Sequence, residues 1–254
     1  MNNLKVINGF LLTPNVLTSN AFEELYIALR LKEGRIFSEK EIARLPVVEA
    51  SHQHYKEWLI RKRSCKKLLR YIKRRGHIHN ILEIGCGNGW LAAQMASVTK
   101  GKVTGIDINT VELEQAKKVF RSIPNLKFAE GDIRSGMLAD EKFDLIVFAA
   151  SVQYFESLRE ILKTAIMYLT LQGEIHITDT HLYQSREVAA ASQRSKKYFA
   201  DIGFPEMSQL YFHHCIQEIG SLQFSILHDP HSWANKLSLR RNPFYWLSVK
   251  NHYM

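Results

Sequence analysis

The pattern of apolar and polar positions changes along this 254-residue chain at about residue 77. Before that point, apolar residues recur every three or four positions, which is the period of an amphipathic helix. After it, short apolar runs that predict strands alternate with stretches of helical period. Such alternation is typical of a parallel α/β sheet. We therefore expect a helical extension over residues 1–76 and an α/β domain over residues 77–254.

The extension is expected to contain three helices. Two begin with pairs that resemble capping boxes, Asn20 with Glu23 and Ser38 with Glu41. The first would end near Gly34 and the second near Pro46, because these residues do not continue a helix well. The third and longest is predicted between residues 51 and 76.

The α/β domain should supply seven strands. They are expected at residues 81–84, 102–106, 125–129, 143–148, 174–178, 221–227 and 242–249. Helices are predicted at residues 91–96, 111–121, 157–169 and 186–200, with another between 211 and 220. The last strand is expected to lie antiparallel to its neighbour at the sheet edge. Residues 182–220 are longer than a plain connection requires, so we expect a substrate lid there.

Three glycines at every second position follow the first strand, in the segment ILEIGCGNGW at residues 81–90. Glycine permits positive φ and has no Cβ to hold a ligand away, and the helix that follows offers free N–H groups to an anion. The segment therefore predicts a cofactor site. The nicotinamide fingerprint G-x-G-x-x-G fits Gly85 and Gly87 but places Trp90 at its third glycine.

Acidic residues follow the next two strands. Asp107 comes about 20 residues after the glycines, where a carboxylate can accept hydrogen bonds from both hydroxyl groups of a ribose. Asp132 follows the third strand, and by itself it is equally consistent with an ordinary turn after Gly131. The combination of the glycine segment and two acids in this order is more specific than any one of them.

Together these residues resemble the class I S-adenosylmethionine (SAM)-dependent methyltransferases, over roughly residues 78–180. The resemblance implies a Rossmann-like, doubly wound, mostly parallel seven-stranded sheet with an antiparallel last strand, plus an N-terminal helical cap. It also implies SAM as the cofactor and S-adenosylhomocysteine (SAH) as the product. The residues expected to bind the cofactor are Arg61, Glu83, Gly85, Cys86, Gly87, Gly89, Asp107, Ile108, Asp132, Ile133 and Ala149.

The resemblance assigns roles to several of these residues. Asp132 would receive the adenine amino group, and Ile108 and Ile133 would sandwich the ring. Glu83 would be a water-linked partner of the methionine ammonium group. Arg61 or Arg63 would reach the methionine carboxylate, although both are equally consistent with ordinary surface charges.

The acceptor should be encoded after the fourth and fifth strands. The segment AASVQYF at residues 149–155 lacks the Asn- or Asp-Pro-Pro-Tyr of enzymes that methylate amino groups of nucleic-acid bases, and it looks more like the small-molecule branch. The catalytic candidates are His181 and Tyr154, with Asp179 a further possible base; His181 is also consistent with a loop lining, and Tyr154 with the core. Residues expected to line the substrate site are Tyr55, Trp58, Gln153, Tyr183, Tyr211, His213 and His214.

Composition narrows the class of protein. The chain is 46% hydrophobic and 23% charged, without an apolar run as long as a membrane span or a signal-peptide pattern. Its three cysteines are far apart, which favours reduced thiols and a cytoplasmic location. The eleven histidines form no zinc-binding pattern with cysteines, so no metal is expected.

The net charge of +9 has a local origin. Nine of the 34 basic residues lie between Arg61 and Arg75, and the other 25 equal the 25 acidic residues. This run is consistent with the solvated face of one helix, or with a patch that binds an anionic substrate, a lipid headgroup or RNA. We expect methyl transfer to a small molecule, not to nucleic acid, and no membrane insertion. The alternatives are an RNA or protein methyltransferase that uses the helix 61–75, or a SAM-binding protein without catalysis.

Overall fold

The structure is a computed structural model that describes residues 5–7, 10–12 and 19–250. It begins with the antiparallel strand pair β1 (Lys5–Ile7) and β2 (Phe10–Leu12), followed by α1 (Ser19–Lys32), α2 (Glu39–Ile42) and α3 (Tyr55–Arg75). The capping box of Ser38 and Glu41 is confirmed. The side chain of Asn20 lies outside the described residues, and the carboxylate of Glu23 accepts a hydrogen bond from the backbone N–H of Thr110 on a different helix.

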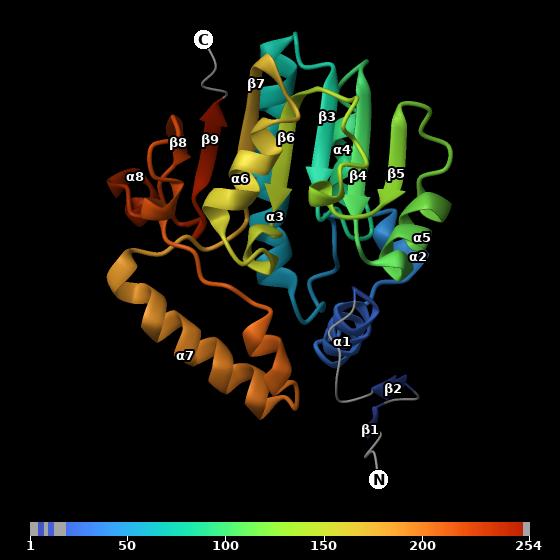
Figure 1. Ribbon diagram of the computed structural model, residues 1–254, viewed down its shortest axis with the longest axis vertical. Helices are drawn as coiled ribbons and strands as arrows, with labels where there is room; N and C mark the ends of the chain where they lie inside the picture. Colours follow the sequence, from blue (N-terminus) through green and yellow to red (C-terminus); the bar gives the residue numbers. More distant parts are fainter. Residues whose placement is uncertain (1–4, 8–9, 13–18, 251–254) are drawn as a thin grey trace.

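A seven-stranded sheet in the order β5-β4-β3-β6-β7-β9-β8 forms the centre of the molecule (Figure 1). Its strands are β3 (Asn80–Ile84), β4 (Lys102–Asp107), β5 (Leu126–Glu130), β6 (Phe143–Ala149), β7 (Leu169–Thr178), β8 (Phe224–His228) and β9 (Trp246–Lys250). The first five are parallel, whereas β9 is antiparallel to both β7 and β8. The carboxyl ends of the parallel strands therefore meet at one edge of the sheet.

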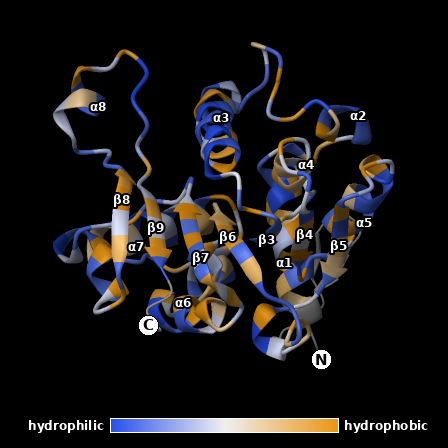
Figure 2. Ribbon diagram, turned by 90° about the horizontal axis from the view of Figure 1, so that it is seen from above, coloured by the Kyte–Doolittle hydropathy of each residue, from blue (hydrophilic) through white to orange (hydrophobic). Residues whose placement is uncertain are grey.

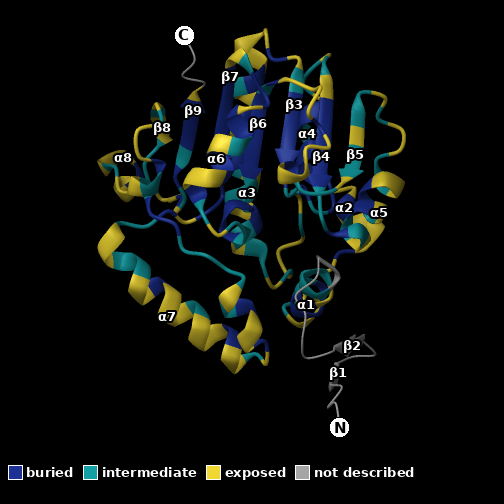
Figure 3. Ribbon diagram, in the orientation of Figure 1, coloured by how far each residue is buried: buried dark blue, intermediate teal, exposed yellow. Residues whose placement is uncertain are grey.

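The last strand is antiparallel, as predicted, but it does not lie at the sheet edge, so that part of the prediction is wrong. β9 lies between β7 and β8, and β8 is the outer strand. Leu247 and Val249 of β9 are fully buried, whereas Ile226 and Leu227 of β8 are 47% and 39% exposed (Figure 3). A strand covered on both faces needs such buried apolar residues, and an edge strand does not.

Helices cover both faces of the sheet, with α3 and α4 (Trp90–Ala96) on one side and α6 (Leu158–Ile166) on the other (Figure 2). Successive strand residues point to opposite faces, so Ile81 packs in the cluster with Leu68 of α3, whereas Leu82 packs in the cluster with Leu162 of α6. The remaining helices are α5 (Thr110–Val119), α7 (Ser185–Asp201) and α8 (Trp233–Leu237).

α1 and α7 lie beyond the carboxyl ends of the parallel strands (Figure 1). They meet in a separate apolar cluster that includes Leu29 of α1 and Phe199 of α7. The predicted helix between residues 211 and 220 is reduced to the short 3-10 helix Ile216–Ile219. The backbone before it is extended because it pairs with other segments: Phe212 N–H donates to Gln153, and Tyr183 N–H donates to His214.

Candidate active site

The glycine turn after β3 is shaped by close contacts at its two ends. Gly85 has φ of 73°, and a Cβ there would lie 2.5 Å from the Cβ of Ser151. Gly89, the N-cap of α4, also has φ of 73°, and a Cβ there would lie 2.4 Å from the Phe128 ring. Gly85 lines the cavity at the turn, whereas Gly89 packs against the ring of Phe128 and does not line it.

Asp107 is held against this turn by backbone groups. Its Oδ2 atom accepts from Gly87 N–H at 2.7 Å, and its Oδ1 atom accepts from Asn109 N–H at 2.8 Å. Burial raises the pKa of Asp107, and these hydrogen bonds oppose the rise. Each carboxylate oxygen can still accept another hydrogen bond, which suits two adjacent ribose hydroxyl groups.

Asp107 lines a cavity of about 380 Å³ at the carboxyl ends of β4, β5 and β6. Ile108, Asp132 and Ile133 line it, as the sequence predicts. Burial alone would raise the pKa of Asp132, but hydrogen bonds from Arg134 outweigh burial and lower it. An aromatic base could therefore lie between apolar side chains beside a carboxylate that is ionised at neutral pH.

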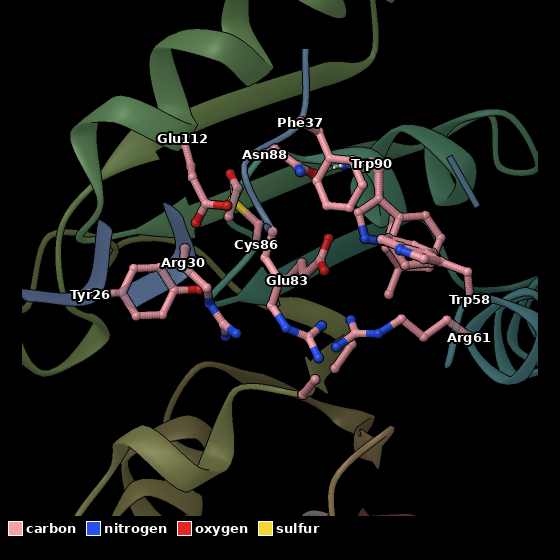
Figure 4. Close-up of a pocket in the computed structure, with 16 residues that line it drawn as sticks. Tyr26, Arg30, Phe37, Trp58, Arg61, Glu83, Cys86, Asn88, Trp90 and Glu112 are labelled. Carbon is pink, nitrogen blue, oxygen red and sulfur yellow. Dashed lines mark hydrogen bonds between the residues drawn. The ribbon is translucent and has the colours of Figure 1, made fainter. Parts of the chain in front are cut away.

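The cleft continues past the turn to a second group of side chains, shown in Figure 4. Arg61, Trp58, Cys86 and Ala149 line this part, together with Glu83. Glu83 is buried, and its Oε2 atom has no hydrogen-bond partner among the described residues. Burial first, and then the neighbouring charge of Asp107, raises the pKa of Glu83 well above its usual value.

These observations fit SAM. A buried carboxylate without a partner suits the methionine ammonium group, because ion pairing would compensate for its desolvation. The glycine turn leaves room for the cofactor to approach the protein backbone, and Asp107 lies where it could accept hydrogen bonds from the ribose hydroxyl groups. The residues present can therefore hold the cofactor from its adenine to its amino-acid end.

Arg61 is better placed than Arg63 for the methionine carboxylate. Its Nε atom donates to Glu57 at 2.9 Å, its guanidinium lies 5.5 Å from the Trp58 ring centroid, and it lines the cavity (Figure 4). Its Nη groups make no hydrogen bond to the described residues. Arg63 instead donates to the carbonyl of Arg241 at 3.4 Å.

α1 roofs the cleft with side chains that the sequence analysis did not identify. Arg30 donates to the hydroxyl of Tyr154 at 2.9 Å and lies 4.7 Å from the centroid of the Tyr26 ring. Burial is the largest influence on Tyr26 and Tyr154 and raises the pKa of both phenols. Tyr154 is therefore protonated at neutral pH and is not available as a base. The only sequence signal was Tyr26 on the apolar face of a helix, which is equally typical of a core residue.

Glu112 was also missed. It lies in the first turn of α5 and lines the cleft, and its Oε2 atom would be 3.2 Å from a Cβ on Gly87. Burial first, and then the charge of Asp107, raises its pKa to about 7. In the sequence it is indistinguishable from any acid at a helix start.

The structure places His181 and Tyr183 outside the cleft. Both line another cavity between α7 and the segment around Arg241, and the two rings stack with centroids 5.9 Å apart. The candidate base Asp179 is buried and lines neither cavity; its Oδ1 atom has no hydrogen-bond partner among the described residues. Of the two catalytic candidates, only Tyr154 lines the cofactor cleft.

Most of the residues expected to line the substrate site instead contact other parts of the protein. His214 is buried between the carbonyl of Val152 and the carboxylate of Glu218. Gln153 donates to Ala150 at 2.6 Å and accepts from Thr180. Neither lines the cleft, and the same is true of Tyr55, Tyr211 and His213; Trp58 does line it. Tyr211 packs edge-on against Tyr154, and His213 pairs with Ser195 at 2.8 Å.

The fold and the cleft together define a class I SAM-dependent methyltransferase. The chain belongs to the family described as "Methyltransferase domain", whose model matches residues 78–235. The fold, the methyltransferase family and its cofactor are thus as the sequence predicts. In the described ranges, no helix has the length and apolar composition needed to cross a membrane, and no group of three or more His, Cys, Asp or Glu side chains there could hold a metal ion.

Relatives show the same class with different acceptors. The chain is 25% identical over 158 residues to malonyl-[acyl-carrier protein] O-methyltransferase of Bacillus anthracis, covering 61% of this chain and 57% of that protein. It is 36% identical over 83 residues to demethylmenaquinone methyltransferase of Chlorobaculum parvum, covering 33% of each. The matches thus span little more than half of these relatives, or less.

A solved structure shows the fold over most of the chain. Magnesium protoporphyrin IX methyltransferase from Synechocystis PCC 6803, with bound SAH, superposes with a TM-score of 0.61 at 13% identity, covering 92% of this chain and all of that one. At this identity the likeness establishes the shared fold alone.

Proposed function

We propose that the protein transfers a methyl group from SAM to an oxygen, nitrogen or carbon atom of a small-molecule acceptor. The observation that carries the proposal is the buried Glu83 carboxylate, which has an unpartnered oxygen at the glycine turn. An amino-acid ammonium group is the natural partner for it. Asp107 lies on the other side of the same turn, at the place expected for a ribose.

When bound, SAM would supply an electrophilic methyl group for attack by an electron pair of the acceptor atom, and SAH would be the leaving group. The protein aligns the two reactants, and alignment of this kind can lower a barrier by about 7–11 kcal/mol. The α1 roof, which includes Tyr26 and Arg30, limits the access of water. We assign Tyr154 a positioning role through Arg30, because its phenol stays protonated.

The acceptor is proposed to be small for two reasons. The segment 149–155 lacks the sequence of base-amino methyltransferases, and Tyr26 and Arg30 of α1 line the cleft beside the glycine turn. The two relatives above are named for malonyl-[acyl-carrier protein] and demethylmenaquinone. The basic helix is partly used within the fold: Arg61 pairs with Glu57, and Arg75 pairs with Glu174. This weakens the case for RNA recognition by the whole run.

The test is calorimetric binding of SAM and SAH to the wild type, to Asp107→Ala, and to Asp140→Ala as a control with an exposed acid remote from the cleft. We expect micromolar binding that weakens about tenfold or more in Asp107→Ala, because a charge-assisted contact to the ribose is lost. Asp140→Ala should bind like the wild type. An acceptor screen with methyl-labelled SAM follows.

Each outcome separates the alternatives. Absence of SAM binding to the wild type would overturn both the cofactor assignment and the proposed methyl transfer. Tight binding without transfer to any acceptor would favour a SAM-binding protein without catalysis. Transfer to RNA that falls steeply with salt would replace the small-molecule acceptor.

A further inference from the structure

A second cavity, separate from the cofactor cleft, lies between α7 and the β8–β9 connection. Its volume is about 670 Å³, within the range of about 300–1,000 Å³ that is usual for small-molecule sites. It shares no lining residue with the cleft described above. SAM bound in the cleft would therefore leave this cavity free for another ligand.

The cavity is strongly cationic. Arg186 and Arg194 project from one face of α7, two helical turns apart, and Arg241 faces them from the β8–β9 connection. No carboxylate among the described residues forms an ion pair with any of the three. The one acid in the lining, Glu187, uses an oxygen to accept from Gln184 N–H at 2.9 Å.

The wall that carries Arg241 is held in place by hydrogen bonds. Asn242 N–H donates to Asn235 at 2.9 Å, and the amide of Asn235 donates back to the Asn242 carbonyl at 3.0 Å. Asn242 also donates to Ser64 of α3, and Arg63 donates to the Arg241 carbonyl. Through these contacts α3 holds the backbone that carries Arg241, whose exposed side chain lines the cavity.

Two neighbouring rings, His181 and Tyr183, also line the cavity. They stack at an interplanar angle of 27°, and Phe244, which does not line the cavity, packs edge-on against His181 at 4.7 Å. Burial first, and then the charge of Arg194, lowers the pKa of His181, so the ring is neutral at pH 7. The cavity therefore combines positive charge from three exposed arginines with a neutral ring surface.

We propose that this cavity binds a phosphate ester with a planar organic group, with the phosphate on Arg186, Arg194 and Arg241 and the ring against His181 and Tyr183. Guanidinium groups match phosphate oxygens in geometry as well as charge. Stacked rings suit a flat group. The inference stands apart from the proposed methyl transfer, because the binding needs no acceptor and no turnover.

The test is calorimetric binding of phenyl phosphate and inorganic phosphate, with and without saturating SAH. The variants are R186A/R194A and, as a control, R70A/R74A, which removes the same charge from exposed positions on α3. We expect R186A/R194A to weaken phenyl phosphate about tenfold or more, because charge-assisted hydrogen bonds are lost, and the control to bind within about twofold of the wild type. Phenyl phosphate should bind about tenfold tighter than inorganic phosphate, because the ring stacks.

Other results would overturn the proposal. Equal weakening in both double variants would mean that net charge alone attracts the anion. Displacement of phenyl phosphate by SAH would place it in the cofactor cleft. Equal affinity for phenyl phosphate and inorganic phosphate would mean that the cavity binds the anion alone and does not recognise the organic group of an ester. Thermal unfolding of each variant confirms that the comparison is between folded proteins.

Discussion

Glu112 shows how burial gives an ordinary helix-start acid a pKa of about 7. Nothing in its immediate sequence distinguishes it. It lies beside Asp107, five residues upstream, and against Gly87, which is 25 residues upstream. The contact with Gly87 is decided by the packing of α5 on the glycine turn. The consequence is a group that titrates at physiological pH inside the cofactor cleft.

We expect SAM affinity to rise between about pH 6 and 8 and binding to release a proton. SAM is cationic at sulfur and nitrogen, so binding favours the ionised form of Glu112, whose pKa is about 7 in the free protein. In the same way, the stability of the free protein should fall as pH rises from the usual glutamate range towards 7, because the folded state holds the proton more tightly. Calorimetry in two buffers of different ionisation enthalpy measures the proton release.

Glu112→Gln should remove most of this pH dependence. Asp140→Ala, at an exposed acid, serves as the control and should keep it. An unchanged pH profile in Glu112→Gln would assign the titration to another group, of which Glu83 is the nearest candidate by its raised pKa.

At the scale of elements, the turn between β3 and α4 depends on close packing as well as on backbone conformation. Gly89 and Gly136 have almost the same φ, 73° and 77°. A Cβ on Gly89 would strike Phe128, whereas a Cβ on Gly136 meets nothing within 4 Å. The two positions therefore separate steric overlap from backbone strain.

Gly89→Ala should destabilise the protein by about 3 kcal/mol or more, because overpacking adds to the cost of positive φ. Gly136→Ala should cost about 1 kcal/mol, from positive φ alone. Urea denaturation measures both differences. Equal losses in the two variants would contradict the role of Phe128 packing.

Most elements follow from local pattern. The strands near the glycine turn and the helices α3, α5 and α7 lie close to their predicted ranges, because their apolar periodicity matches the faces they bury. The segment 211–214 departs from its prediction because its backbone groups bond to Gln153 and Tyr183, which lie far away in sequence. Tertiary pairing overrides a weak local preference there.

At the scale of the whole molecule, α3 is joined to the sheet by a buried polar group on β7. Tyr71 of α3 donates to Glu174 at 2.6 Å, and Ser248 of β9 donates to it at 2.6 Å. Trp246 N–H donates to His176 Nδ1, which leaves the Nε2 proton of a neutral His176 to bond Glu174. Burial first lowers the pKa of His176, in agreement with this neutral form.

Glu174→Gln should destabilise the protein by about 3 kcal/mol near pH 7, because it removes the charge from a buried, fully bonded group. Hydrogen bonds from His176, Ser248 and Tyr71 outweigh burial and lower the pKa of Glu174 to about 2. Its contribution is therefore present above the usual glutamate pKa and is lost as pH falls from about 4.5 towards 2.

Chemical denaturation at pH 7 and pH 3 measures this difference. Glu160→Gln is the matched control, since Glu160 pairs with Lys163 at the surface and should change stability by about 0.5 kcal/mol or less. A Glu174→Gln loss that is the same at both pH values would show that its charge does not contribute.

The sequence by itself determined the α/β fold, the glycine turn and the acids after β4 and β5, because strand period, glycine spacing and strand-end residues are local and the carboxyl ends of parallel strands must meet. Only the tertiary structure decided that β9 lies inside the sheet, that α1 roofs the cleft with Arg30, and that His181 faces a different cavity. These outcomes depend on contacts between residues far apart in the chain. No local pattern in the sequence distinguishes a cavity-lining residue such as Arg30 or His181 from a residue at the surface or in the core.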